Sequence, residues 1–435
     1  MKILAISQQW APEDGTPQRR FSQLTRGLTS RGHEVRVVAA PPHYPGGVLT
    51  SADPRHAPGA IAEGDNGETV YRSRFREHSR SLTSRIEDQG IVAISSWWIA
   101  RKLVKSWRPD VIISTAPPLP QVVVTALIGK RFRVPYVVDL RDVWPDILTY
   151  MNEWGNQAEA NPQNRIKATA YDALIATGGK VFNWALHGAT AIVTTTPSFA
   201  EKLRSEGFQR VLNVRNMASV RDDKLPTLAE MDYLDGTNRE PGTLRVLYAG
   251  TTGRAQGLES ALEAVRLTEE AGVDIQMRVV GSGSHLRLLK LQAERDHLPV
   301  EFTGRMPFSE VLEEYAWSDT TLVHLRNWEP LNYTVPSKLY ESLSVSRHVT
   351  VAANGESARI ITESGAGDAV PAMDPQALAD LWTRLANDRQ QLNVANSGRN
   401  WLLARETPDE NTEKFARFLS TLPSRSDRFR WDLLH

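Results

Sequence analysis

MKILAISQQWAPEDGTPQRR, residues 1–20, indicates the opening unit of a parallel α/β fold. Residues 2–7 form a short apolar run of the kind that becomes a buried strand. Gly15 then precedes the pair Thr16 and Pro17, which favours a helix with Thr16 as its N-cap. A glycine directly before a helix N-terminus lets a phosphate approach the backbone amides, although an ordinary turn also uses glycine. A strand, a loop and a helix in this order are the repeating unit of a parallel sheet.

The same alternation continues along the chain and predicts an α/β fold with two doubly wound, Rossmann-like domains. The expected strands cover residues 2–7, 34–40, 110–116, 136–141, 191–196, 211–216, 244–249, 274–280, 300–303, 320–325 and 348–353. Residues 217–243 show neither the alternating hydrophobic pattern of a strand nor the 3.6-residue pattern of a helix, and they contain Pro and Gly. They therefore indicate a linker. We therefore expect an N-terminal domain over residues 1–216 and a C-terminal domain over residues 244–407. Ligands bind beyond the carboxyl ends of such strands, so we expect both domains to direct loops at a central cleft.

The remaining segments are one loop and a C-terminal extension. Residues 41–65 are rich in Pro, Gly and Ala, which predicts a mobile loop on the N-terminal domain. Residues 408–435 begin with a helical pattern that has Phe415 and Phe418 on one stripe. We expect this helix to cross back to the N-terminal domain. The tail over residues 423–435 shows no pattern that assigns it a role.

Composition and charge exclude several classes of protein. The chain has 435 residues, and its 51 Lys and Arg balance 51 Asp and Glu, so no overall field favours nucleic acid as a partner. The absence of Cys excludes disulfides, thiolate metal sites and cysteine nucleophiles. No apolar run approaches the ~18 residues of a membrane-spanning helix, and the first apolar run is too short for a signal peptide. We expect a cytoplasmic protein.

Three further segments carry residues suited to phosphate binding. GTTGRAQG, residues 250–257, follows a strand but lacks the Lys and Ser or Thr of a P-loop. GSGSHL, residues 281–286, lacks the third glycine of the dinucleotide fingerprint, which disfavours an oxidoreductase. In NYTVPSKLYESLSV, Pro336 can start a helix that places Lys338 and Glu341 one turn apart. This pair can hold a phosphate and two sugar hydroxyls, and an ordinary surface ion pair explains it equally well.

Six segments, taken together and in order, carry a resemblance to a known family. They are WAPEDGTPQRRFSQLTRGLTSRGHEVRVV with PPHYPGG, VPYVVDLRDVWPD, TTTPSFAEKLRSEGF, YAGTTGRAQGLESALEAV, FTGRMPFSEVLEEYAWSD and VPSKLYESLSV. Over residues 1–405 the chain resembles glycosyltransferase family 4, which has the GT-B fold. It is most similar to the bacterial subgroup that transfers N-acetylated amino sugars in surface polysaccharide synthesis. The resemblance implies a retaining transfer from a nucleotide diphosphate sugar, usually a UDP-sugar, to a glycan or polyprenyl-linked acceptor, with no cofactor and no obligatory metal.

The resemblance also implies roles for individual residues. Gly15 would approach the donor diphosphate from the first domain, and Glu341 would hold the ribose hydroxyls. Lys338 and Arg254 would be the cations nearest the diphosphate. The backbone contacts to the base would come from Arg305 and Met306.

Three departures from the family pattern affect this assignment. Thr251 and Gln256 stand where many members have an Arg and a Lys, so other cations must meet the phosphate charge. Tyr333 replaces the first glutamate of the E-x7-E motif, and Arg141 replaces a His that is common before Asp142. We still expect Thr251 and Gln256 to line the donor site. The expected catalytic residues are Arg141, Asp142, Lys338 and Arg254.

The stretch DLRDVWPD also contains three carboxylates that suggest a metal. These are Asp139, Asp142 and Asp146, and their spacings of three and four do not define a metal site. We expect no metal here. Asp139, at the end of an expected strand, is predicted to be a buried, hydrogen-bonded structural acid.

Residues 91–108 mix Trp97, Trp98 and Trp107 with four basic residues. Aromatic and basic residues on one helix suit an anionic membrane interface, and they equally suit a packed helix with a solvated basic edge. The lipid-linked acceptors that the resemblance implies favour a peripheral contact with the inner face of the cell membrane.

Two alternative functions share the expected fold. A UDP-sugar epimerase would need acids and bases for elimination but no acceptor site. A noncatalytic nucleotide-sugar-binding protein is suggested by the missing loop Arg and Lys. The long first-domain loop and the Trp-rich helix favour an acceptor, and therefore a transferase.

Overall fold

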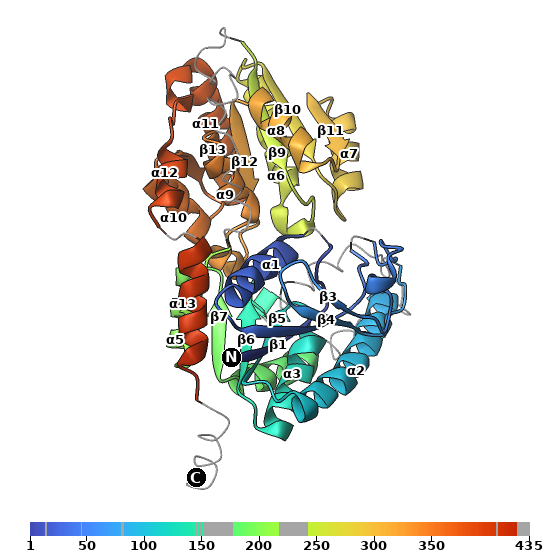
Figure 1. Ribbon diagram of the computed structural model, residues 1–435. Helices are drawn as coiled ribbons and strands as arrows, with labels where there is room; N and C mark the ends of the chain where they lie inside the picture. Colours follow the sequence, from blue (N-terminus) through green and yellow to red (C-terminus); the bar gives the residue numbers. More distant parts are fainter. Residues whose placement is uncertain are drawn as a thin grey trace. The chain divides into compact units, whose positions relative to one another are not determined.

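The computed structural model forms two compact units, which are described separately (Figure 1). The first is Met1–Ala218 with Thr407–His435, and the second is Ser219–Glu406. The residues described are 1–13, 15–44, 46–79, 82–144, 146–147, 150, 177–216, 242–405 and 408–423. The expected linker and C-terminal tail lie almost wholly outside these ranges.

Within the described residues, the first unit is built on an eight-stranded sheet in the order β3-β4-β2-β1-β5-β6-β7-β8. The strands are β1 (Lys2–Ser7), β2 (Glu34–Ala39), β3 (Ile61–Glu63), β4 (Thr69–Arg72), β5 (Val111–Ala116), β6 (Tyr136–Leu140), β7 (Ala191–Thr194) and β8 (Val211–Asn213). Each pairs in parallel with its neighbours, except that β3 is antiparallel to β4. The chain reverses its direction of winding between β1 and β5, so the loops after these two strands begin the crevice where such sheets bind ligands.

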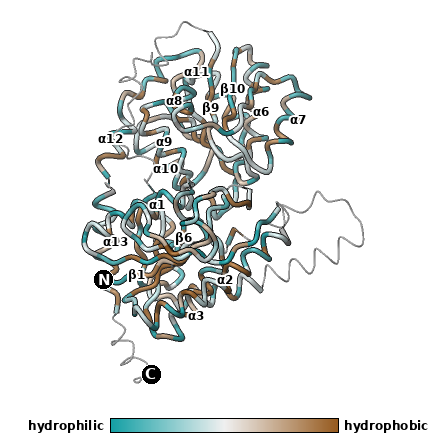
Figure 2. The backbone as a smooth tube through the Cα atoms, turned by 45° about the vertical axis from the view of Figure 1, so that its right-hand side comes forward, coloured by the Kyte–Doolittle hydropathy of each residue, from teal (hydrophilic) through white to brown (hydrophobic). Residues whose placement is uncertain are grey.

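Helices cover both faces of this sheet (Figure 1). They include α1 (Thr16–Thr29), α2 (Leu82–Ser106), α3 (Leu119–Phe132), α5 (Pro197–Ser205) and α13 (Pro408–Ser420). Ile3 and Ala5 of β1 pack in one core with Phe21 of α1 and Phe415 of α13. Because side chains alternate along a strand, Leu4 points to the opposite face, where α2 and α3 contact β1. Figure 2 shows the hydrophobic residues concentrated in strands such as β1 and β6, with polar residues frequent on the helices.

The second unit has a six-stranded, fully parallel sheet in the order β11-β10-β9-β12-β13-β14, counted over the residues described. The strands are β9 (Leu244–Ala249), β10 (Ile275–Val280), β11 (Val300–Gly304), β12 (Thr320–His324), β13 (His348–Ala352) and β14 (Gly367–Val370). The helices are α6 (Leu258–Glu270), α7 (Leu286–Arg295), α8 (Phe308–Trp317), α9 (Ser337–Ser344), α10 (Gly355–Ser364), α11 (Pro375–Asn387) and α12 (Ser397–Leu403). This strand order is that of a dinucleotide-binding sheet, and its switch point lies between β9 and β12.

The α/β class and all eleven expected strands are confirmed, and the differences are local. The strands β3, β4 and β14 were not predicted. In β3 and β14, an acidic residue within three or four positions leaves no apolar run to recognise. The expectation of a mobile loop over residues 41–65 is wrong in part, since a 3-10 turn (Pro54–His56) and β3 lie within it. The N-cap of α1 is Gly15 rather than Thr16, so the helix begins one residue earlier than predicted.

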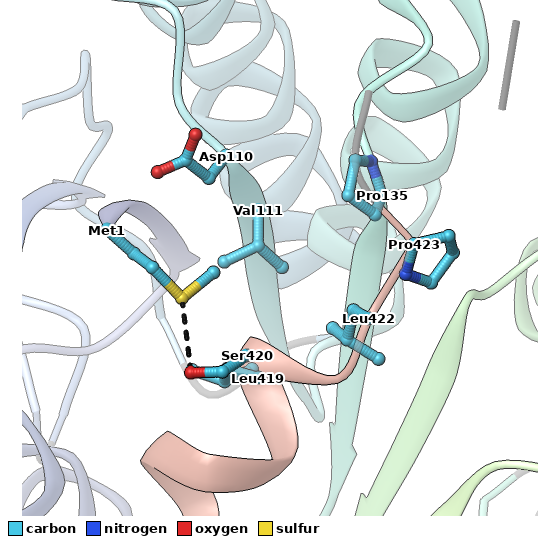
Figure 3. A pocket seen from close by; sticks show the side chains of 8 residues that line it. All are labelled: Met1, Asp110, Val111, Pro135, Leu419, Ser420, Leu422 and Pro423. Carbon is cyan, nitrogen blue, oxygen red and sulfur yellow. Dashed lines mark hydrogen bonds between the residues drawn. The ribbon is translucent and has the colours of Figure 1, made fainter. Parts of the chain in front are cut away.

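The C-terminal end of α13 lies at the amino edge of the first sheet (Figure 3). There, Leu419 and Leu422 line a cavity of about 340 Å³ together with Met1 and Val111. Ser420 donates a hydrogen bond to the sulfur of Met1 across 3.8 Å. Parallel sheets bind ligands at the carboxyl edge, so this cavity is not the candidate site. Among the described helices, none is both long and apolar enough to cross a bilayer.

Candidate functional site

The glycine-rich loops after β9 and β10 pack directly against each other. Gly250 has φ of +151° and donates its amide to Val280 across 2.8 Å, which extends the pairing of the two strands. A Cβ on Gly281 would lie 1.8 Å from the carbonyl oxygen of Gly250, and one on Gly283 would lie 2.3 Å from that of Thr252. These glycines are therefore required for close backbone approach, whatever ligand the loops bind.

Lys338 is the residue around which the candidate site is built. It is the second residue of α9, and only 9% of it is exposed. Its Nζ lies 3.5 Å from the ring centre of Tyr248 and has no hydrogen-bond partner among the described residues. A Cβ added to Gly250 would lie 3.0 Å from that Nζ, so the ammonium sits directly over the glycine. Buried ammonium groups are rarely left without an acceptor, so this position is a candidate anion site.

The electrostatics at Lys338 are dominated by burial. Loss of solvent lowers the pKa of Lys338 to about 7, and the nearby charge of Glu341 opposes that shift. Glu341 lies one turn later on α9 and is half-buried. The structure thus confirms a helix that begins beside Pro336 and carries both residues. The alternative, an ordinary ion pair on the surface, is excluded because the side chain of Lys338 is buried.

The turn after β9 is held by its own side chains. The Oε1 atom of Gln256 accepts a hydrogen bond from the amide of Gly253 at 3.0 Å, across the short turn that Arg254 begins. The hydroxyl of Tyr248 donates to the carbonyl of Thr251 at 2.5 Å, while Thr251 itself is exposed. The side-chain oxygen of Gln256 therefore stabilises the loop. This oxygen is already used as a hydrogen-bond acceptor, so it is less available to bind a sugar nucleotide.

His324 and Arg326 belong to the same cluster and were missed in the sequence. The Nδ1–H of His324 donates to the carbonyl of Gln256 at 2.7 Å, and its buried Nε2 has no hydrogen-bond partner among the described residues. Burial lowers the pKa of His324 to about 4, so the ring is neutral. Arg326 donates from Nε to the carbonyl of Arg254 at 2.8 Å and pairs with Glu259. Polar residues at the end of an expected strand were the signal that would have found them.

Arg305 and Met306 follow β11 at the same carboxyl edge of the sheet. The carbonyl of Gly304 accepts a hydrogen bond of 2.6 Å from the amide of Gly281, which joins this segment to the loop after β10. Arg305 is exposed, whereas Met306 packs against a small core that includes Leu247. The structure therefore brings residues 305–306 to the edge that also holds the glycine loops.

The other expected site residues, Gly15, Arg141 and Asp142, lie in the first unit. Arg141 follows β6 and donates from Nε to the hydroxyl of Thr115 at 3.0 Å and from Nη2 to the carbonyl of Pro117 at 2.8 Å. Burial raises the pKa of Asp142, and the adjacent Arg141 opposes that shift. Arg141 and Asp142 thus lie next to the loop after β5, at the switch point of the first sheet.

Gly15 and Asp139 are held by neighbouring side chains of the first unit. A Cβ on Gly15 would lie 2.5 Å from the Oε1 of Gln18, so the helix N-terminus is closely packed. Asp139 is 2% exposed and accepts hydrogen bonds from Arg20 at 2.8 and 3.3 Å. The prediction that Asp139 is a buried structural acid is confirmed.

Comparisons with known proteins agree with this architecture. Residues 15–216 match the family model described as a glycosyl transferase 4-like domain, and residues 243–388 match the model described as glycosyl transferases group 1. A protein of Escherichia coli (strain K12), WcaI, named as a glycosyl transferase of colanic acid biosynthesis, is 24% identical over 359 residues, which are 81% of this chain and 83% of its own.

Two solved structures show the same fold over nearly the whole chain. Sucrose-phosphate synthase from Thermosynechococcus elongatus has a TM-score of 0.68 and 16% identity, and covers 97% of this chain and 99% of its own. HepE from Anabaena, solved in complex with UDP-glucose, has a TM-score of 0.62 and 14% identity, and covers 97% of this chain and 100% of its own. With a family match on each unit and this fold throughout, the chain belongs to glycosyltransferase family 4 and has the GT-B fold.

Proposed function

We propose that this glycosyltransferase takes its sugar from a nucleoside diphosphate donor, a UDP-sugar, and retains the anomeric configuration. The observation that carries the proposal is the buried ammonium of Lys338, which lies over Gly250 without a hydrogen-bond partner among the described residues. A diphosphate oxygen is an acceptor that suits it, because a charged hydrogen bond compensates for lost solvation. The complex of HepE with UDP-glucose supports the choice of nucleotide.

The proposed donor site assigns one role to each residue at the carboxyl edge of the second sheet. Lys338 and Arg254 meet the diphosphate, in place of the missing loop Arg and Lys. Glu341 accepts hydrogen bonds from the two ribose hydroxyls. The base contacts the backbone at Arg305 and Met306. Thr251 lies beside the diphosphate and contributes through its backbone and hydroxyl.

The proposed reaction needs no protein nucleophile. The bond from the anomeric carbon to the diphosphate oxygen breaks, and a bond to the acceptor oxygen forms on the same face of the sugar. The departing diphosphate takes the acceptor proton, so the protein mainly stabilises negative charge on that leaving group. Lys338 and Arg254 supply this stabilisation. We assign Arg141 and Asp142 to orienting the acceptor or the donor sugar, and Gly15 to backbone approach to the diphosphate.

The finer proposal is that the donor sugar is an N-acetylated amino sugar and that the acceptor is a glycan or a polyprenyl-linked sugar. The changes at Thr251, Gln256 and Arg141 support it, since they fit the amino-sugar subgroup that the sequence resembles. The first unit would hold most of the acceptor. A lipid-linked acceptor would place the protein at the inner face of the cell membrane.

The surface of α2 supports a membrane contact in part. Ile94 and Trp98 are exposed, and the guanidinium of Arg101 lies over the ring of Trp98 at 5.3 Å. The expectation that Trp97, Trp98 and Trp107 share one surface is wrong for Trp107. This residue is buried and donates its indole N–H to Glu34. The proposed contact is therefore limited to the outer face of α2.

One experiment tests the function against its alternatives. The full chain is incubated with a panel of UDP-, GDP- and dTDP-sugars, with and without a polyprenyl diphosphate sugar acceptor, and nucleotide release and sugar products are followed by chromatography and NMR. A transferase releases UDP faster when the acceptor is present, and the anomeric coupling constant of the product reports retention. Interconversion of the donor without an acceptor would identify an epimerase, and binding without turnover would identify a noncatalytic protein.

A further inference from the structure

Three side chains of the first unit converge outside all the residues assigned above. They are His43 from the loop after β2, His78 from the segment after β4, and Asp88 from α2. One ligand atom from each lies within 4.8 Å of the other two. We propose that these residues bind one divalent transition-metal ion of the zinc class.

Both histidines already have the tautomer that a metal ligand needs. The Nδ1 of His43 lies 2.8 Å from the carbonyl oxygen of Pro41, and the Nδ1 of His78 lies 3.0 Å from that of Ser79. A carbonyl oxygen can only accept, so in each ring Nδ1 carries the proton. In a neutral imidazole this leaves the lone pair on Nε2. A backbone carbonyl that holds the other ring nitrogen is the usual second partner of a metal-bound histidine.

The carboxylate of Asp88 is buried without a Lys or Arg within ion-pair distance among the described residues. Only 1% of Asp88 is exposed, and its nearest basic group is the Nε2 of His78 at 4.0 Å. Its oxygens accept hydrogen bonds from Gln8 at 3.0 Å and from the amide of Arg76 at 3.1 Å. Neutral donors orient the carboxylate but leave its charge uncompensated, and a buried charge ordinarily needs a partner. A divalent cation would supply it.

The backbone around the two histidines is built to keep them together. The amide of Gly47 donates to the carbonyl of His43, and the amide of His78 donates to the carbonyl of Gly47, each at 2.9 Å. Gly47 has φ of +80°, and a Cβ there would lie 2.4 Å from the ring of His78. His43 is itself buried against the ring of Phe75 at 4.6 Å between centres. Two segments remote in sequence are thus joined through one glycine that no larger residue can replace.

The ligand set indicates which ions fit. Two imidazoles and one carboxylate suit Zn²⁺ and its first-row neighbours, whereas Ca²⁺ and Mg²⁺ prefer oxygen ligands throughout. Ligand atoms on one zinc ion lie about 3.4 Å apart, since each is about 2.1 Å from the metal. The three atoms must therefore draw together slightly, which rotation of the partly exposed His78 allows. Three protein ligands leave a fourth position for water or an anion.

The bound ion would join three segments at the carboxyl edge of the first sheet. The loop after β2 and the segment after β4 both leave that edge, and Asp88 would tie them to α2. The ion would therefore stabilise the loops of the unit proposed to hold the acceptor. This inference is independent of the proposed donor site.

The test measures metal binding by the full chain without nucleotide. The protein is purified without a polyhistidine tag, stripped with a chelator, and titrated with Zn²⁺ in a calorimeter, with Co²⁺ as a spectroscopic probe. We expect about one equivalent bound, a visible absorption band with Co²⁺, and a rise of about 5 °C in the unfolding temperature at zinc concentrations near a hundred times Kd.

Two conservative variants and a matched control make the test specific. His78→Gln and Asp88→Asn remove a ligand with little change in shape, and each should lower zinc affinity at least tenfold and abolish the Co²⁺ band. His187→Gln is the control, because His187 is an exposed histidine of the same unit whose Nδ1 also bonds a carbonyl, that of Asn183. Far-UV circular dichroism checks that each variant folds. The proposal is overturned if the wild type binds no equivalent of zinc, or if both ligand variants bind it as the wild type does.

Discussion

At the scale of single residues, Lys338 is the side chain that tests whether the start of α9 binds the nucleotide donor. A charged hydrogen bond to phosphate contributes ~1.5–3 kcal/mol, so Lys338→Ala should weaken UDP binding roughly tenfold to a hundredfold. Calorimetry on the full chain measures this. Lys290→Ala, which removes an exposed lysine from α7 of the same unit, is the control and should leave Kd unchanged. Equal affinities for the wild type and Lys338→Ala would remove Lys338 from the site.

The lowered pKa of Lys338 makes nucleotide binding depend on pH. In the free protein burial holds the pKa of Lys338 at about 7, and a bound diphosphate raises it, because a nearby anion favours the charged form. Between these two pKa values binding takes up a proton, so UDP affinity should fall as pH rises from 7 to 9. Titrations in buffers of different ionisation enthalpy measure the proton uptake. His324, with its pKa near 4, stays neutral over this range. A proton uptake of zero at pH 8 is the contrary result.

Glu341 gives a prediction about the ribose. A carboxylate that accepts hydrogen bonds from two vicinal hydroxyls discriminates against a sugar that lacks one of them. UDP should therefore bind more tightly than 2′-deoxy-UDP, by roughly tenfold for one lost charged hydrogen bond. Glu341→Gln should remove most of that difference and leave the fold intact. If both proteins distinguish the two nucleotides equally, another residue holds the ribose.

At the scale of secondary-structure elements, α13 has a clear energetic role. Phe415 is 2% exposed and packs with residues of α1 and β1. Phe415→Ala should destabilise the first unit by about 3–5 kcal/mol, the usual cost of removing a buried phenyl ring. Urea unfolding followed by circular dichroism measures the loss. Arg417→Ala on the exposed side of the same helix should change stability by less than ~0.5 kcal/mol. Similar losses for both variants would show that α13 contributes no specific packing.

The elements also show why the sequence predicted some features and missed others. The central strands are short runs of five or six residues rich in apolar or β-branched side chains, so β1, β9 and β12 were found. The helix at Pro336 was found because proline marks a helix start, and this placed Lys338 and Glu341 together. Contacts between residues that are brought together only by the order of strands in the sheet leave no pattern in the local sequence. His324 reaches the loop after β9 only because β9 and β12 are neighbours in the sheet.

The same reason explains the residues of the first unit. Arg20 and Asp139 meet because α1 and β6 come together in the fold, and spacing alone could not pair residues so far apart in the chain. The position of Asp139 at a strand end was enough to predict burial but not its partner. His43, His78 and Asp88 likewise come from three different segments, and nothing in the sequence of any one of them indicates a metal ligand.

At the scale of the whole molecule, a balanced net charge restricts how the protein can reach a membrane. With 51 basic and 51 acidic residues, attraction to anionic lipid must come from a local patch. Replacing Arg101, Lys102 and Lys105 of α2 with Glu should reduce cosedimentation with liposomes of anionic lipid by tenfold or more, at about 1 kcal/mol per basic residue. Liposomes of neutral lipid are the control, and binding that the triple variant leaves unchanged is evidence against the contact.

The return of α13 to the first unit has a consequence for biosynthesis. The first unit consists of Met1–Ala218 and Thr407–His435, so its final helix leaves the ribosome only after the whole second unit has been translated. At ~5–20 residues per second, the nascent first sheet waits roughly 10–40 s for Phe415 and Leu419 to cover it. During that interval the part of the core that α13 covers, beside α1, is open to chaperones. A gene fragment that stops after residue 216 would lack this helix, and a chimera with a single crossover after that residue would combine the first sheet of one parent with the α13 of the other.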